Sequence, residues 1–278
     1  MNLIEHEELI QKLTGIARDL RVLSLKMITE AKSGHPGGSL SAADLVAALF
    51  FHYMNHDPAT PHWEERDRFV LSKGHGVPVV YAAMAKCGYF PEEEIYTLRK
   101  INSRLQGHPD HVRLPFMETS SGSLGQGLSI AQGMALAAKI DKKDIRVYCL
   151  LGDGELQEGQ IWEGAMSAPK YKLDNLITIV DANGGQIDGY TKDVMDLSPL
   201  PRKWESFNWE VQEIDGHDFH EILNALDHAQ HRRGKPHLII ARTIKGKGVS
   251  FMENNIEWHG VAPTPRERDK AIEELLKH

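Results

Sequence analysis

The chain has 278 residues, and its 32 Lys and Arg against 39 Asp and Glu give a formal net charge of -7. This balance excludes the broad basic surface of nucleic-acid-binding proteins, and the two cysteines, Cys87 and Cys149, are too few for a disulfide scaffold or a cysteine-rich zinc site. No run of 18 apolar residues occurs and the acidic N-terminus lacks a basic segment, so we expect no membrane span, no signal peptide and a cytoplasmic protein.

The first half of the chain combines helical patterns with long polar loops. Apolar residues recur at helical spacing over 3–31, and further helices are predicted over 41–53, 77–86 and 125–139. The apolar run at 69–71 predicts a short strand. Glycine, proline and polar residues predict loops over 33–38, 55–67 and 102–121.

In the second half, strands alternate regularly with helices. Strands are predicted over 145–151, 176–180, 209–214 and 237–243, and helices over 159–171, 218–231 and 266–278. This alternation indicates an α/β fold, with one parallel sheet covered by helices on both faces, in a single domain over 1–278. Such sheets bind ligands in the loops at the carboxyl ends of their strands. The predicted binding loops follow Leu151, Val180 and Thr243.

A Gly-Asp-Gly segment follows the strand that ends at Leu151. Gly152 and Gly154 let the backbone approach an anion closely, but Asp153 lies between them and would repel a phosphate. A magnesium ion bridging the carboxylate and a phosphate resolves this conflict. The next strand is followed by Asn183, whose side-chain oxygen could share the same ion because parallel strands end at one sheet edge.

Other interpretations of these loops have to be considered. Turns capped by Asp or Asn explain each loop taken alone. A dinucleotide-binding loop requires Gly-x-Gly-x-x-Gly without an internal acid, and the spacing from Gly152 to Gly159 does not fit it. The phosphate-binding pattern Gly-x-x-x-x-Gly-Lys-Ser/Thr is absent, and the segment from Thr243 to Ser250 does not match it.

Six segments together resemble the thiamine-diphosphate-binding part of transketolases. In chain order they are KSGHPGG at 32–38, LSKGHG at 71–76, GHPD at 107–110, SGSLGQG at 121–127, GDG at 152–154 with Asn183, and WHGVAP at 258–263. Each segment alone is weakly specific, whereas six in the family's order are strongly specific. The resemblance extends over about residues 10–265 and implies a thiamine-diphosphate-binding fold.

The resemblance covers only the first, diphosphate-binding (PP) domain of a three-domain transketolase. It implies the N-terminal subunit of a split transketolase, with the aminopyrimidine and C-terminal domains on a separate C-terminal subunit and an α2β2 heterotetramer as the assembly. It further implies an enzyme of the pentose phosphate pathway that is active only with its partner. That enzyme would move a two-carbon ketol unit from a ketose phosphate to an aldose phosphate, using thiamine diphosphate and Mg²⁺ (or Ca²⁺ or Mn²⁺).

The resemblance also implies roles for individual residues. The metal ligands would be the side chains of Asp153 and Asn183 and the backbone carbonyl of Gly185. The catalytic residues would be four motif histidines: His35 and His108 on substrate hydroxyls, and His75 and His259 on the diphosphate or nearby substrate oxygens. Imidazoles suit these tasks because they donate or accept hydrogen bonds near neutral pH.

The remaining cofactor contacts implied by the family come from several loops. Lys245 would neutralise diphosphate charge and Gly154 would donate its N–H to the diphosphate. Glu158 would lie at the contact with the partner's catalytic acid. The full set of cofactor-binding residues is His75, Gly122, Ser123, Leu124, Asp153, Gly154, Glu158, Asn183, Ile187, Lys245 and His259.

The chain departs from the family pattern at a few positions. Transketolases usually carry proline at the position of Ser123 and a larger apolar residue at that of Gly185, where we expect a looser loop. The basic segment TIKGKG at 243–248 resembles deoxyxylulose-phosphate synthase, which lacks the His-Pro-Gly loop. His217 with His220, and His228 with His231, have metal-ligand spacing, but no third ligand is apparent and we expect solvated histidines.

Two other classes of function remain open. Another thiamine-diphosphate enzyme is one, either deoxyxylulose-phosphate-synthase-like or a 2-oxo acid dehydrogenase component. The four motif histidines disfavour the dehydrogenase, because oxo acids need fewer hydroxyl contacts. A non-catalytic binding protein on the same fold is the other, and it is disfavoured by the presence of Asp153 and Asn183.

Overall fold

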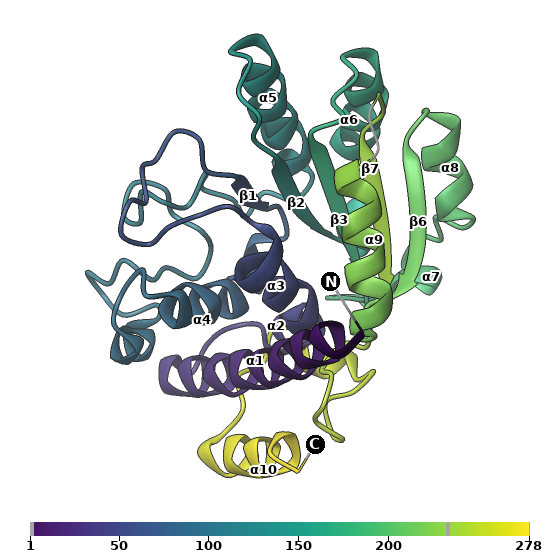
Figure 1. The fold of residues 1–278 in the computed structure, drawn as a ribbon. Helices are drawn as coiled ribbons and strands as arrows, with labels where there is room; N and C mark the ends of the chain where they lie inside the picture. The colour runs from purple at the N-terminus through teal and green to yellow at the C-terminus, as the bar shows by residue number, and fades with distance from the viewer. Residues whose placement is uncertain (1–2, 232–233, 278) are drawn as a thin grey trace.

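The computed structural model describes residues 3–231 and 234–277, so the last residue of the predicted C-terminal helix, at 278, lies outside the described residues. Its centre is a five-stranded, all-parallel sheet with the strand order β1-β2-β3-β7-β6 (Figure 1). These strands are β1 (Arg68–Leu71), β2 (Val147–Gly152), β3 (Leu176–Ala182), β6 (Glu210–Asp215) and β7 (His237–Arg242). A small antiparallel hairpin joins β4 (Gly185–Gln186) to β5 (Gly189–Tyr190).

Helices pack on both faces of this sheet, as the sequence predicts. The helices are α1 (Leu3–Ala31), α2 (Pro36–Ser41), α3 (Ala43–Ala48), α4 (Val77–Cys87), α5 (Gln126–Ile140), α6 (Gly159–Lys170), α7 (Thr191–Val194), α8 (Leu200–Ser206), α9 (Phe219–His231) and α10 (Pro265–Leu275). Short helical turns cover Leu49–Tyr53, Gly74–Gly76, Glu92–Thr97, Gly154–Gln157 and Ile256–His259. Within the described residues, no helix is long and apolar enough to cross a membrane.

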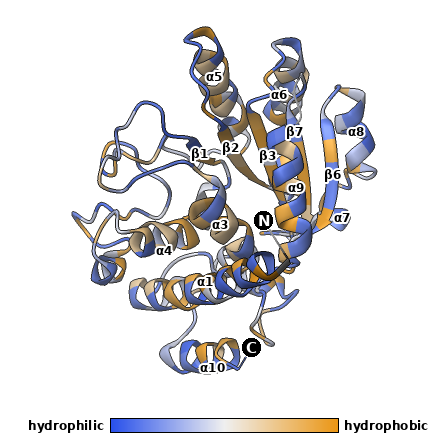
Figure 2. Cartoon of the chain, in the orientation of Figure 1, coloured by the Kyte–Doolittle hydropathy of each residue, from blue (hydrophilic) through white to orange (hydrophobic). Residues whose placement is uncertain are grey.

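Alternate side chains of the central strands enter two separate cores. Tyr148 and Leu150 of β2 lie in the core that contains residues of α1, α3, α4 and α9, whereas Cys149 and Leu151 lie in the core with α5, α6 and α8. Successive strand residues point to opposite faces, and a parallel sheet covered on both sides is therefore apolar along its whole strands. Figure 2 shows this hydrophobic colouring along β2 and β3.

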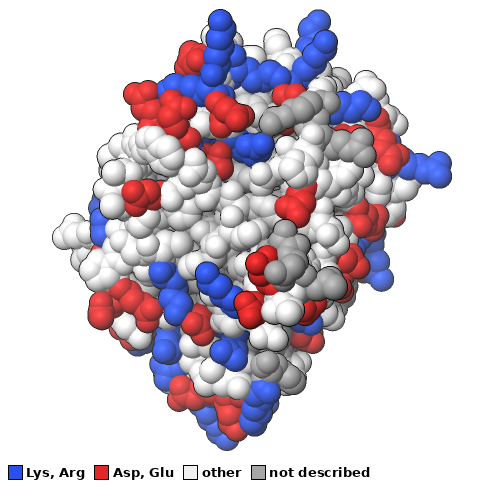
Figure 3. All heavy atoms as spheres, viewed as in Figure 1, with Lys and Arg blue, Asp and Glu red and all other residues white. Residues whose placement is uncertain are grey.

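The first and last helices of the described chain, α1 and α10, pack against one another. Figure 1 shows α1 in purple and α10 in yellow below the sheet, and residues of the two helices contact one another. Charged groups of both signs are interspersed over the face seen in Figure 3. This distribution agrees with the absence of a broad basic field in the sequence.

Three local predictions were wrong. The predicted loop at 33–38 contains the start of α2, because Pro36 occupies the first helical turn, where its fixed φ is favourable. The predicted helix over 41–53 is divided between α2, α3 and a π-helical turn at Leu49–Tyr53. No element was predicted between 185 and 208, but this region holds the β4–β5 hairpin, α7 and α8, which are too short for a clear periodic pattern.

A pair of glycines on α5 tests how closely this helix packs. A Cβ at Gly127 would lie 2.4 Å from Ser72 Oγ, whereas a Cβ at the exposed Gly133 would have no atom within 4 Å. We expect Gly127→Ala to lower the free energy of unfolding by about 1–3 kcal/mol through overpacking. We expect Gly133→Ala to raise it by up to about 1 kcal/mol, through helix propensity alone. Urea denaturation of both variants measures this, and equal effects would contradict the packing described here.

Candidate functional site

The loops after β2, β3 and β7 meet at one edge of the sheet, as predicted, and the loop after β1 joins them there. Gly152 of β2 pairs with Asp181 of β3, and Ala182 of β3 pairs with Arg242 of β7. Asp153 and Asn183 therefore begin neighbouring loops, and Lys245 follows on the third. The predicted metal-binding and phosphate-binding residues lie together because of this register.

A buried ion pair lies beneath these loops. Lys73, after β1, is bonded through Nζ to the carboxylate of Asp181, and also donates to the Gly38 carbonyl at 3.0 Å. Asp181 accepts further hydrogen bonds from Ser41 Oγ at 2.6 Å and from Thr243 Oγ1. Burial alone would raise the pKa of Asp181, but Lys73 and the hydroxyl donors outweigh it and hold the pKa below its ordinary value.

The predicted metal ligands form a cradle of oxygen atoms. Asp153 accepts hydrogen bonds from the backbone N–H of Gly184 at 2.6 Å and of Gly154 at 2.9 Å. Asn183 Oδ1 accepts from the Gly185 N–H at 3.1 Å. Lys245 Nζ donates to the Gly185 carbonyl at 3.1 Å and lies 3.5 Å from Asn183 Oδ1. The ammonium group thus contacts two of the three predicted ligands.

The electrostatics of the cradle suit a divalent cation. Burial, and then the charge of Asp181, raises the pKa of Asp153 to about 6. Burial, and then Lys73, lowers the pKa of Lys245 to about 8. A bound cation would stabilise the Asp153 carboxylate, and all three ligands offer the oxygen atoms that Mg²⁺, Ca²⁺ and Mn²⁺ prefer.

The cradle also leaves part of the coordination to a ligand. Over the described ranges, no group of three or more His, Cys, Asp or Glu side chains is placed to hold a metal ion. The cradle supplies one carboxylate, one amide and one backbone carbonyl, so a bound ion would need further oxygens. Phosphate oxygens are the usual additional ligands of Mg²⁺.

The four motif histidines come together from four separate segments. The ring centroid of His35, beside α2, lies 5.1 Å from that of His75, 5.6 Å from that of His259 and 6.4 Å from that of His108. Nδ1 of His35 and Nδ1 of His259 are buried without a hydrogen-bond partner among the described residues. Buried polar atoms normally have partners, so these two point to a bound ligand.

These histidines are neutral in the folded protein. Burial is the main cause, and it lowers the pKa of His35 to about 4, of His75 to about 2 and of His259 to about 3. Burial and the charge of Arg99 also lower the pKa of His108. Each neutral ring offers one N–H donor and one nitrogen acceptor, a combination that matches a hydroxylated substrate.

The other predicted cofactor residues divide by exposure. Gly122 lies beside His108. Its φ of +149° suits glycine, and a Cβ there would lie only 3.2 Å from His108 Cδ2. Leu124 is half-buried and Ser123 is exposed. Glu158 is exposed at the start of α6, and Ile187, between β4 and β5, is 70% exposed. These exposed side chains are available to a ligand or to another chain.

Two residues of the predicted diphosphate-binding region, Gly154 and Gly185, differ from the sequence-based predictions. The Gly154 N–H, predicted to bind diphosphate, donates to Asp153 in this structure, so its diphosphate role stays a prediction. Gly185 is not in a loose loop: a Cβ there would lie 2.6 Å from Ile256 Cδ1 and 2.9 Å from Lys245 Cδ. The loop is tightly packed because the Lys245 side chain crosses it.

Several buried polar residues at the site received no role from the sequence. Lys73 lies inside the motif at 71–76 and Asp181 lies two residues before Asn183, but roles were predicted only for neighbouring glycine, histidine, Asp153 and Asn183 residues. Glu155 was also missed; it accepts hydrogen bonds from Ser72 Oγ and from the backbone N–H of Gly125 and Gly152. A signal existed, since charged residues directly at the ends of apolar strands require partners.

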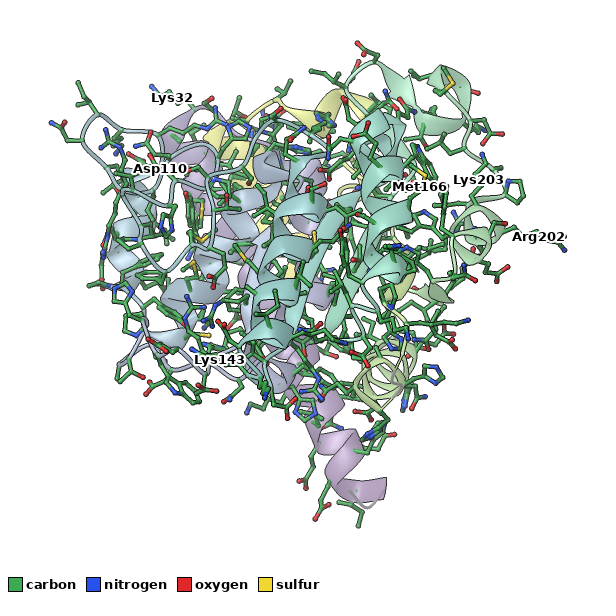
Figure 4. All side chains as sticks on the ribbon, turned by 90° about the horizontal axis from the view of Figure 1, so that it is seen from above. Lys32, Asp110, Lys143, Met166, Arg202 and Lys203 are labelled. Atoms are coloured by element: carbon green, nitrogen blue, oxygen red, sulfur yellow. The ribbon has the colours of Figure 1, made fainter. Side chains whose placement is uncertain are left out.

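Side chains around this edge of the molecule belong to distant segments. Figure 4 shows Lys32, at the end of α1, and Asp110, from the loop that carries His108, projecting on the same side. Arg99 Nη1 donates to Ser33 Oγ at 2.9 Å and its Nη2 lies 3.4 Å from the Gly107 carbonyl. Arg99 therefore links the segment before His35 to the segment before His108.

Comparison with known proteins identifies the family of this chain. Residues 13–275 match the family model "Transketolase, thiamine diphosphate binding domain". The chain is 48% identical to a 6-deoxy-6-sulfo-D-fructose transketolase subunit, SqwG, from Clostridium sp. (strain MSTE9), covering 94% of this chain and 95% of that protein. It is 42% identical to an apulose-4-phosphate transketolase subunit from Actinobacillus succinogenes, covering 98% of this chain and 97% of that protein.

The fold comparison gives the same family at a different length. A crystal structure of transketolase from Campylobacter jejuni superimposes with a TM-score of 0.90 and 36% sequence identity. The match covers 99% of this chain but 43% of that one. The chain therefore spans less than half the length of the solved transketolase that it matches.

The buried neutral histidines predict a pH dependence of stability. Unfolded histidine titrates near pH ~6.5, whereas burial lowers the pKa of His35 to about 4 and of His259 to about 3. As the pH falls below the unfolded value, the unfolded state takes up protons first, so the stability present at neutral pH decreases toward pH ~4. Urea unfolding at pH 7 and pH 5 should show this loss, and His35→Gln should reduce it. An undiminished loss in His35→Gln would exclude His35 as a source.

Proposed function

Since this chain belongs to the transketolase family through its thiamine-diphosphate-binding domain, we propose that it is the N-terminal subunit of a split transketolase. The reaction is transfer of a two-carbon ketol unit from a ketose phosphate to an aldose phosphate. The observation that carries this proposal is the meeting of an oxygen cradle with four neutral histidines at one sheet edge. The cradle suits a metal-bound diphosphate, and the histidines suit a polyhydroxylated substrate.

The proposal assigns the rest of the enzyme to a second chain. Residues 1–278 form one diphosphate-binding domain, and a C-terminal subunit supplies the aminopyrimidine and C-terminal domains. Support comes from the two relatives named as subunits, which this chain matches over 95% and 97% of their lengths. We place the pair in an α2β2 heterotetramer, because most oligomers are closed symmetric assemblies. We further assign the enzyme to the cytoplasm and to the pentose phosphate pathway.

Within the cradle, this chain holds the metal ion and the diphosphate. Asp153, Asn183 and the Gly185 carbonyl bind Mg²⁺, with Ca²⁺ or Mn²⁺ as alternatives, and Lys245 neutralises the remaining phosphate charge. When bound, thiamine diphosphate supplies the electron sink that cleavage of a ketose carbon–carbon bond requires. Gly122, Ser123, Leu124, Gly154 and Ile187 line the remaining cofactor surface, and Glu158 faces the partner chain.

The histidines hold the substrate and its protons. His35 and His108 bind donor hydroxyls, and His75 and His259 bind the diphosphate or neighbouring substrate oxygens. Their neutral state lets each ring accept a hydroxyl hydrogen through one nitrogen and donate through the other. Such positioned bases typically contribute about 10²–10⁴-fold to proton transfer.

The first prediction of this proposal is that the chain requires its partner for activity. We assign the second wall of the site and its activating acid to the partner, so the purified chain should transfer no two-carbon unit with thiamine diphosphate and Mg²⁺. Activity should appear when a C-terminal transketolase subunit encoded beside it is added. Donors to compare are xylulose 5-phosphate, 6-deoxy-6-sulfo-D-fructose and apulose 4-phosphate, the last two being the substrates named for the relatives.

Two outcomes of this assay would contradict the proposal. Full activity of the purified chain alone would exclude a split enzyme. Turnover of pyruvate, without transfer from any ketose, would favour a deoxyxylulose-phosphate-synthase-like enzyme or a 2-oxo acid dehydrogenase component. Failure to bind thiamine diphosphate in any assembly would favour a non-catalytic protein on the same fold.

The second prediction concerns the metal. Asp153→Asn keeps the shape of the side chain but removes the charge that a divalent cation needs, so cofactor affinity should fall by about tenfold or more. Calorimetric titration of the assembled enzyme with thiamine diphosphate and Mg²⁺ measures this. Asp188→Asn is the matched control, because Asp188 is an exposed acid in the turn between β4 and β5. Equal affinities in the two variants would exclude Asp153 as a ligand.

A further inference from the structure

A buried polar chain outside the site ends on the loop that carries Lys245. Arg21 of α1 forms an ion pair with Asp44 of α3, in which Nη1 lies 3.1 Å from Oδ1. His217, just before α9, contacts Asp44 Oδ2 through Nδ1 at 2.7 Å. On its other side, His217 Nε2 accepts the backbone N–H of Ile244 at 2.8 Å. The side chain of His217 is only 10% exposed.

The two hydrogen bonds fix both the protonation and the orientation of this ring. Because Ile244 donates its N–H, Nε2 of His217 must be the unprotonated acceptor, and the proton lies on Nδ1. Nδ1–H then donates to Asp44. Burial opposes the charge of Asp44, but Arg21 and this hydrogen bond hold the pKa of that carboxyl below its ordinary value. The charged Asp44 carboxylate thus holds the ring in the orientation in which Nε2 accepts the Ile244 N–H.

This corrects the expectation that His217 and His220 are both solvated helix residues. His217 precedes α9, which begins at Phe219, and its ring is enclosed between Asp44 and the loop after β7. His220 lies on α9 and its side chain is 51% exposed. Within the described residues, its ring forms one ion-pair contact, with Glu7 at 3.7 Å. The two histidines share a spacing but not an environment.

Three consecutive residues of the loop are anchored by three different groups. Thr243 donates to Asp181, Ile244 donates to His217, and Lys245 reaches the Gly185 carbonyl. Lys245 is only 2% exposed, so the packing around it restricts its long side chain to one conformation. The position of its ammonium group therefore depends on where the backbone at 243–245 is held.

We propose that His217 is a positioning residue that fixes the Ile244 N–H and thereby directs Lys245 into the metal cradle. His217 contacts neither the cradle oxygens nor the four motif histidines through any hydrogen bond of the described chain. Its effect passes through the backbone of one neighbouring residue. The effect on cofactor affinity rests on the proposed function, whereas the effect on the loop does not.

Two substitutions separate the two hydrogen bonds of this ring. In His217→Asn, the shorter amide keeps a donor near the position of Nδ1, so the bond to Asp44 is retained and the bond to Ile244 is lost. In His217→Gln, the longer amide places an acceptor oxygen near the position of Nε2, so the bond to Ile244 is retained. His220→Asn, three residues away on an exposed side chain, is the matched control.

Hydrogen–deuterium exchange of the 243–247 segment is the first measurement, made on the purified chain. We expect the Ile244 amide to exchange about tenfold faster in His217→Asn than in the wild type, His217→Gln or His220→Asn, the effect of losing one hydrogen bond. Thermal unfolding of all variants shows whether each is folded. Equal exchange in the Asn and Gln variants, or faster exchange in Gln, would overturn the proposal.

Calorimetric titration of the assembled enzyme with thiamine diphosphate and Mg²⁺ is the second measurement. His217→Asn should weaken cofactor affinity about tenfold and His217→Gln much less. In the Lys245→Met background, His217→Asn should cause no further loss, because residues that act through one group are not additive. Additive losses would show that His217 does not act through Lys245. If the wild type binds no cofactor, the proposed function fails while the exchange result still decides the role of His217.

Discussion

The buried ion pair between Lys73 and Asp181 is the interaction on which the architecture of the site depends. It joins the segment after β1 to the end of β3, across the intervening β2, and Thr243 extends it to the loop after β7. Both charges are excluded from water, so removing either partner would leave a buried charge uncompensated, at a cost of about 3–5 kcal/mol. The additional donors, Ser41 among them, explain how the carboxylate stays charged there.

The helix α2 transmits this constraint to the two halves of the site. The Gly38 carbonyl accepts a hydrogen bond from the Lys73 ammonium group, and a Cβ at Gly37 would lie 2.9 Å from Lys245 Cγ. The same helix begins directly after His35, whose ring meets the other motif histidines. Two adjacent glycines thus let α2 fit between the side chains of Lys73 and Lys245 and the imidazoles, so the proposed metal-binding and substrate-binding regions share one wall.

Much of this was predictable from sequence, because the signals were local. The alternation of apolar runs indicated the five strands within a few residues, and the loops after them brought Asp153 and Asn183 together. The partners of the buried charges were not predictable, since Lys73 and Asp181 lie more than a hundred residues apart and only the strand order places them in contact. The hydrogen bond by which we propose that His217 fixes Ile244 involves a backbone N–H, which carries no sequence signature at all.

The proposed cofactor-binding residues differ in exposure, and this difference bears on how the enzyme assembles. The Lys73–Asp181 pair is buried and the cradle residues Asp153 and Asn183 are half-buried, whereas Ser123, Glu158 and Ile187, which we propose for the same cofactor, are exposed. Tyr190 and Met195, which follow Ile187, are also largely exposed apolar side chains, and exposed apolar groups gathered in one segment favour contact with another surface. A ligand held between the half-buried cradle and these exposed residues would stay open to solvent until a second chain covered it. The closed, water-poor environment that strengthens electrostatic interactions would then arise on assembly, which gives a physical reason for the partner requirement that we propose.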